Sequence, residues 1–262
     1  MKVLNLLSHT SLITAFYSAI LTFFSELTLK GQYSNLVYIN FLATLIGYNL
    51  ISLVALNNRI TSGRMYWQKN NQTLLITLTA LSAISLIFFL LNLDLIQLII
   101  LSHLFIIIFF YENNSTRMIS LRSKIYLKPF IIAYIWSISC SFLIQPEIKT
   151  STTILWAEVF LSILSLSLIY DIRDQQYDSK NNFSTLVHKY GTKKIKAFAI
   201  RSFIISLFLR MSFFPFKDFW GIYLLEICLF LLFTFKVHSG SSRSILVFLV
   251  DGLILLRLLY LL

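Results

Sequence analysis

The stretch on which the fold depends reads DIRDQQYD, from Asp171 to Asp178, and it follows directly on a long apolar run. Its aspartates stand at spacings of three and four, so a helix would place Asp171, Asp174 and Asp178 on one face. Three carboxylates on one face repel one another unless a cation lies among them, and a hard divalent ion such as Mg²⁺ is one candidate. The alternative is a solvated helix end whose charges are neutralised by neighbours such as Arg173 and Lys180.

The composition predicts a membrane protein. Of the 262 residues, 57% are hydrophobic and 13% are charged, and the mean hydropathy is +0.78. Apolar runs of roughly 17–22 residues recur from end to end, which is the length that crosses a bilayer as a helix. We therefore expect an all-α, polytopic integral membrane bundle. The net charge of +11 is typical of basic loops in such proteins, so we expect the lipid bilayer, and no nucleic acid, among the partners.

The apolar runs predict nine membrane-spanning helices. Their expected bounds are 12–29, 36–56, 74–91, 95–111, 129–145, 153–170, 197–214, 219–235 and 244–262. The loops after the second, fourth, sixth and eighth spans hold fifteen Lys and Arg residues, against three in the other loops. Because basic loops stay in the cytoplasm, we expect the N-terminus inside and the C-terminus outside. The Asp-rich stretch then lies on the cytoplasmic face, and we expect the cell inner membrane.

Two further segments place polar residues near the same expected membrane face. In YNLISLVALNN, Asn49, Leu53 and Asn57 are four residues apart and share one helix face. Asn49 either bonds a neighbouring helix or reaches a ligand. In IYLKPF, Lys128 lies at the start of the fifth span. It is either an interfacial anchor or a partner for an anionic ligand.

Seven ionisable residues lie inside the predicted spans. Such residues are functional candidates by default, but several lie near span ends, where long side chains reach the interface. We therefore expect structural roles for them. They are Glu26, Glu158, Arg201, Arg210, Glu226, Asp251 and Arg257.

These segments together resemble the UbiA-type intramembrane prenyltransferases. In that family a motif DxxDxxxD follows helix six and leads into a TLP…G stretch. Here DIRDQQYD leads into STLVHKYG, Ser184–Gly191, with Val187 at the position of the proline. Lys128 matches the family's lysine before helix five. The resemblance implies a nine-helix bundle with a central cavity opening near the cytoplasmic side, and one UbiA-like transmembrane domain over residues 1–262.

The chain departs from the family at the first Asp-rich motif, which follows helix two and has the form NDxxDxxxD. Asn49 matches the asparagine, but the three aspartate positions read Leu50, Leu53 and Asn57. In the family, both motifs together hold Mg²⁺ ions that bridge a prenyl diphosphate. Here one of the two motifs has lost all of its carboxylates.

The resemblance implies a transferase that moves a prenyl chain from a prenyl diphosphate to a hydrophobic, aromatic acceptor within the membrane, with Mg²⁺ as cofactor. Asp171 and Asp174 would be catalytic residues, and together with Asp178 they would hold Mg²⁺. The residues implied to bind the diphosphate are Asn49, Arg59, Arg64 and Lys128. The missing carboxylates leave an alternative, a non-catalytic UbiA-like membrane protein that binds an isoprenoid lipid or a membrane partner.

Overall fold

The computed structural model describes residues 2–30, 34–58, 63–112, 127–180, 185–213, 220–241 and 251–261. All regular structure in these ranges is helical, so the all-α prediction is confirmed for the described chain. The helices are α1 (Lys2–His9), α2 (Leu12–Lys30), α3 (Leu36–Asn58), α4 (Gly63–Asn70), α5 (Gln72–Leu90), α6 (Leu95–Glu112), α7 (Leu127–Ser139), α8 (Thr150–Lys180), α9 (Leu186–Tyr190), α10 (Thr192–Phe213), α11 (Trp220–Lys236) and the 3-10 helix η2 (Asp251–Leu261).

Most predicted spans coincide with helices, but the number nine is not confirmed. α2, α3, α5, α6 and α11 match predicted spans closely, whereas α8 and α10 are longer than predicted. α7 is shorter, because turns at 140–144 replace its expected last part. Of the ninth span, 244–250 lies outside the described residues and 251–261 is a 3-10 helix. Within the described ranges, four helices are long and apolar enough to cross a membrane: Leu12–Lys30, Leu36–Leu56, Gln72–Leu90 and Thr150–Ser179.

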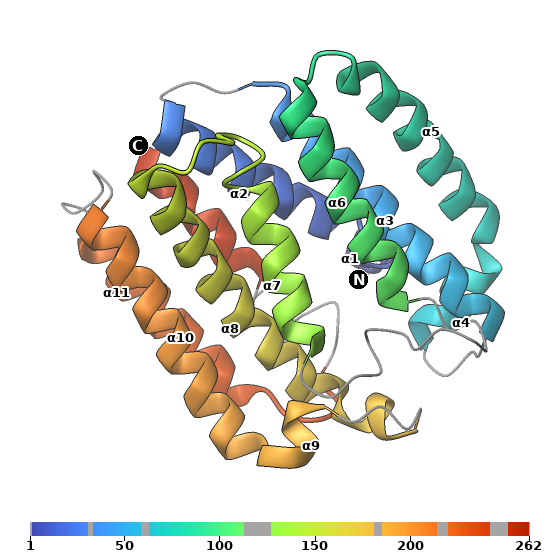
Figure 1. The fold of residues 1–262 in the computed structure, drawn as a ribbon. Helices are drawn as coiled ribbons and strands as arrows, with labels where there is room; N and C mark the ends of the chain where they lie inside the picture. Colours follow the sequence, from blue (N-terminus) through green and yellow to red (C-terminus); the bar gives the residue numbers. More distant parts are fainter. Residues whose placement is uncertain are drawn as a thin grey trace.

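The long helix α8 lies at the centre of the arrangement. It contains no proline or glycine, and some of its hydroxyl groups bond within the helix, as Ser165 Oγ does when it donates to the Ser162 carbonyl at 2.6 Å. In lipid every backbone polar group must be bonded within the protein, which favours an unbroken helix. α8 therefore continues through the Asp-rich stretch to Lys180. It packs against α7 and α10 (Figure 1).

Two apolar cores hold the helices together. The larger surrounds α8 and includes Leu168 with Phe203 and Phe230, whose rings stack at 4.0 Å. The smaller joins α3 to α6 through buried residues such as Ile46 and Leu101. In Figure 1, α3, α5 and α6 lie on one side of the molecule and α8, α10 and α11 on the other, with α7 between them.

Large apolar side chains also cover the outer surface. Phe88 on α5, Phe109 on α6, Phe208 on α10 and Phe235 on α11 are all more than three-fifths exposed. Monomeric soluble proteins rarely expose extended apolar patches. An outer face of this kind suits contact with lipid tails.

Four of the ionisable residues within the apolar helices form one buried network. Arg210 on α10 bonds Glu158 on α8 at 2.7 Å and Glu226 on α11 at 3.0 Å. Arg257 on η2 donates to both oxygens of Glu158, at 2.8 and 3.1 Å, and to Ser162 Oγ at 3.1 Å. Two arginines and two glutamates balance in charge, and all four are buried. The network ties α8, α10, α11 and η2 together, as the expected structural role requires.

The other three ionisable residues differ from one another. Glu26 accepts hydrogen bonds from the backbone N–H of Ser34, at 2.8 Å, and from its hydroxyl group. Arg201 is exposed. The side chain of Asp251 lies outside the described residues.

Candidate functional site

The Asp-rich stretch is helical, so its three aspartates share one face of α8, as the sequence predicted. The side chains of Asp171 and Asp178 are 1% exposed and that of Asp174 is 25% exposed. A solvated helix end does not bury two of its carboxylates. The burial therefore requires a cationic partner close to them.

Lys128 at the start of α7 supplies that partner. Its Nζ lies 2.8 Å from Asp171 Oδ1, 3.3 Å from Asp178 Oδ2 and 3.8 Å from Asp174 Oδ2. Arg173 binds the other oxygen of Asp174, with Nε at 2.7 Å and Nη2 at 2.6 Å. Two cations against three carboxylates leave this cluster with one net negative charge. Of the three aspartates, Arg173 therefore neutralises Asp174 alone. The side chain of Lys180 lies outside the described residues.

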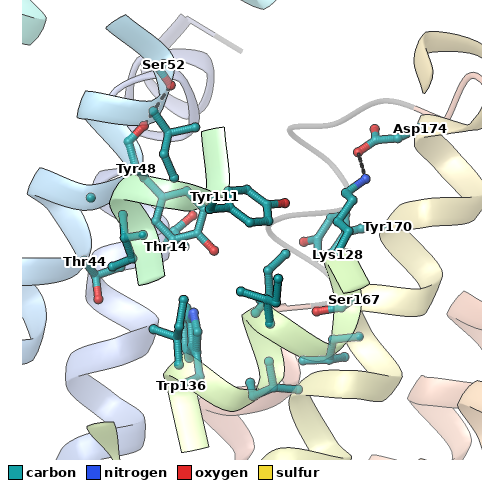
Figure 2. A pocket seen from close by; sticks show the side chains of 18 of the residues that line it. Thr14, Thr44, Tyr48, Ser52, Tyr111, Lys128, Trp136, Ser167, Tyr170 and Asp174 are labelled. Carbon is teal, nitrogen blue, oxygen red and sulfur yellow. Dashed lines mark hydrogen bonds and ion pairs between the residues drawn. The ribbon is translucent and has the colours of Figure 1, made fainter. Parts of the chain in front are cut away.

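A cavity of about 850 Å³ opens beside this cluster. Lys128 and Asp174 lie on its wall, where Figure 2 shows their side chains meeting. Tyr177 extends the same wall, and its hydroxyl donates to Met65 Sδ of α4 at 3.8 Å. Arg64, the residue next to Met65, lines the cavity as well. We call this part of the cavity, where α4, α7 and α8 meet, the Asp-rich end.

The body of the cavity is long and apolar. Along α3 its wall runs from Asn40 to Ala55, a rise of roughly 22 Å at 1.5 Å per residue. Isoleucines, leucines and aromatic rings from α3, α6, α7 and α8 make up much of its apolar lining. At the far end, Asn40 donates to Thr22 Oγ1 at 2.7 Å and to the Ser139 carbonyl at 3.1 Å. The shape and lining suit a flexible hydrocarbon chain with a polar head at the Asp-rich end.

The residues expected to bind a diphosphate are only partly brought together. Lys128 and Arg64 line the cavity, and Arg64 Nη2 lies 3.2 Å from Ser11 Oγ and 3.5 Å from Ser52 Oγ. Arg59 lies outside the described residues. Asn49 is fully buried but is not among the described residues that line the cavity, and its amide atoms have no hydrogen-bond partner within the described chain.

The neighbouring stripe of α3 faces the cavity instead. Thr44, Tyr48 and Ser52 stand four residues apart and all line the wall (Figure 2). Sequence reasoning singled out the stripe through Asn49 and Leu53 because of the family motif. The sequence signal for the face of α3 that lines the cavity was the four-residue spacing of Thr44, Tyr48 and Ser52.

The three aspartates in this arrangement do not fit a magnesium ion. Mg²⁺ requires carboxylate oxygens at about 2.0–2.1 Å in near-octahedral geometry. The point on which the carboxylates converge holds the Lys128 ammonium group. Within the described ranges, no group of three His, Cys, Asp or Glu side chains is spaced to hold one metal ion.

Comparisons with known proteins bear on the fold. No protein-family model matches the sequence, and no curated protein matches it. Among solved structures, the chain is similar to digeranylgeranylglyceryl phosphate synthase, reported in work on its biosynthesis in membranes, with a TM-score of 0.55. The two share 18% sequence identity, and the match covers 98% of this chain and 95% of the synthase chain. At this identity the likeness establishes the fold, and the apolar helices agree with an integral membrane protein.

Proposed function

We propose that the protein transfers a prenyl chain from a prenyl diphosphate to a hydrophobic, aromatic acceptor within the membrane. One observation carries the proposal: a long apolar cavity leads to a cluster of charged residues that match a UbiA-type motif. The fold shared with a synthase of a prenylated lipid supports the same function. We extend the proposal to one UbiA-like domain whose Asp-rich end faces the cytoplasm, in keeping with the charge of the loops.

Different parts of the cavity would have different roles. The apolar body would bind the prenyl chain, and Lys128 and Arg64 would bind the phosphate groups. The allylic C–O bond breaks, and both of its electrons leave with the diphosphate. The acceptor then bonds to the allylic carbon and loses a proton. Tyr170 and Tyr111 line this part of the cavity, and their rings would stabilise the positive charge that develops on the allylic carbon.

The assignment of Asp171, Asp174 and Asp178 to Mg²⁺, and of Asn49 and Arg59 to the diphosphate, stays a prediction from the resemblance. The chain's own geometry supports a different part for the aspartates. They hold the Lys128 ammonium group at the cavity wall.

The experiment is a transfer assay. Purified protein receives labelled farnesyl or geranylgeranyl diphosphate with a panel of aromatic acceptors, with Mg²⁺ or with EDTA. We expect diphosphate release that falls by about two orders of magnitude in Asp171→Asn and Asp174→Asn, the usual effect of removing an electrostatic group from an active site. Glu147→Gln is the matched control, because this carboxylate is exposed in a loop beside Lys149. Equal release by all the variants, or none by the wild type, rejects the transferase.

A second candidate rests on the sequence of α3. Leu50, Leu53 and Asn57 replace the family's aspartates, so α3 supplies none of the expected carboxylates. A protein that binds an isoprenoid lipid or a membrane partner without catalysis needs no such groups. Binding of prenyl ligands with no release across the whole acceptor panel supports this candidate.

A further inference from the structure

Lys128 lies where a metal ion would have to lie if the three aspartates shared one. We propose that Lys128 takes the place of that ion and is the built-in counter-ion of Asp171, Asp174 and Asp178, keeping the carboxylates together with no divalent cation bound. The inference rests on the proposed function only for the identity of the site. Its test uses no prenyl ligand, so either proposal can fail while the other stands.

The Lys128 ammonium group lies within ion-pair distance of all three carboxylates and donates a hydrogen bond to Asp178 Oδ2 at 3.3 Å. Its Nζ is 2.8 Å from Asp171 and 3.3 Å from Asp178, the two buried carboxylates, and 3.8 Å from Asp174. Asp174 has a second cation in Arg173, at 2.6 Å. Each of the three carboxylates therefore has a positive partner that belongs to the chain itself.

The helix ends show why this pairing holds. Lys128 is in the first turn of α7, where the helix dipole disfavours a positive charge. Asp178 is in the last turn of α8, where the dipole disfavours a negative charge. α7 and α8 pack against each other so that these two ends meet. Each charge is unfavourable at its own helix end and is stabilised by the other.

A metal ion on the same oxygens would compete with Lys128. An ion bound at about 2.1 Å from Asp171 Oδ1 would lie within about 5 Å of the ammonium group, which is itself 2.8 Å from that oxygen. Like charges so close repel strongly beside the two buried carboxylates. Among the described residues that line the cavity, Asp174 is the one acidic residue, so the lining offers no further carboxylate to offset that repulsion. A divalent cation therefore binds these aspartates only if Lys128 leaves them.

The test is a titration of the full-length protein in detergent with MnCl₂, in which electron paramagnetic resonance measures the free Mn²⁺. Thermal unfolding in EDTA and in MgCl₂ is measured alongside. The variants are Lys128→Met, the double variant with Asp171→Asn added, and Lys149→Met as the control. Lys149 also pairs with a carboxylate, that of Glu147, but both side chains are more than half exposed.

We expect the wild type and Lys149→Met to bind no stoichiometric Mn²⁺ and to unfold at the same temperature in EDTA and in MgCl₂. In EDTA, Lys128→Met should unfold at a lower temperature than the wild type, and MgCl₂ should restore its unfolding temperature. It should bind one Mn²⁺ about tenfold or more tightly than the wild type does, because the competing charge is gone. The added Asp171→Asn should abolish that binding.

One stoichiometric Mn²⁺ in the wild type, together with an unfolding temperature that EDTA lowers, overturns the proposal. Failure of Lys128→Met to gain Mn²⁺ also overturns it. If Lys128→Met does not accumulate as folded protein, the wild-type titration decides, since the proposal requires that it show no stoichiometric binding.

Discussion

Replacing Arg257 by methionine tests whether the buried ionic network holds η2 to the bundle. Arg257 donates to both oxygens of Glu158, at 2.8 and 3.1 Å, and to Ser162 Oγ at 3.1 Å. Methionine preserves much of the apolar stem but removes the charge and all three hydrogen bonds. Glu158 keeps Arg210 as its partner, and the network is left with one uncompensated negative charge.

Breaking one side of a buried ion pair costs about 3–5 kcal/mol. A chain of this size class loses roughly 2–4 °C of unfolding temperature per kcal/mol. We therefore expect Arg257→Met to unfold about 6–20 °C below the wild type, the range that these two figures give together. Adding Glu226→Gln restores neutrality, because Arg210 can then pair with Glu158 alone. The double variant should be more stable than the sum of the single effects predicts, by about 0.5–3 kcal/mol.

The assay is thermal unfolding in detergent micelles, followed by circular dichroism, of the wild type, both single variants and the double variant. Lys149→Met serves as the control, because it breaks an ion pair that is exposed, and it should leave the unfolding temperature unchanged. An unfolding temperature of Arg257→Met equal to that of the wild type refutes the structural role of the buried network. So does a double variant whose loss equals the sum of the single losses.

Substitutions at three glycines give further predictions. Gly47 lines the cavity, and an added Cβ would meet Ile108 Cδ1 at 3.6 Å, an ordinary contact. Gly47→Ala should keep the affinity for a fluorescent prenyl analogue, and Gly47→Leu should lose most of it. Equal affinities of these two variants would contradict the assignment of the cavity body to the prenyl chain. Gly191 follows α9 at φ +78 and ψ 154, a region essentially restricted to glycine. Gly191→Ala should lower the free energy of unfolding by about 1–3 kcal/mol, measured by denaturant titration, whereas Gly221→Ala, with open space and no positive φ, should cost nothing.

The sequence was sufficient to predict most of the long apolar helices and much of the Asp-rich end. Apolar runs predict helices because a chain in lipid must bond its own backbone groups. The spacing of the aspartates predicted their common face on α8. The position of Lys128 before an apolar run made it a candidate partner for an anionic ligand, and its contact with the aspartates was not predicted. Both predictions depend on the local sequence, which fixes helix geometry within two turns.

Rotations of helices and contacts between distant segments were not predictable in the same way. Asn49 and Tyr48 are adjacent in sequence, but only Tyr48 lines the cavity, because neighbouring helices decide which face of α3 turns inward. Glu158 and Arg257 are 99 residues apart and come together through tertiary packing. Their sequence signal was only that each is an ionisable residue in an apolar run.

The charge at the Asp-rich end separates the two candidate functions. In the cluster on α7 and α8, Lys128 and Arg173 oppose three carboxylates and leave one net negative charge. A prenyl diphosphate adds more negative charge, so it binds well only with positive charge from a metal ion or from the basic loops. An isoprenoid with an uncharged head needs no such charge, because burial of its chain in the apolar cavity stabilises the complex. Tighter binding of a prenyl alcohol than of its diphosphate in EDTA therefore indicates a protein that holds isoprenoids, and reversal of that order by Mg²⁺ indicates a transferase.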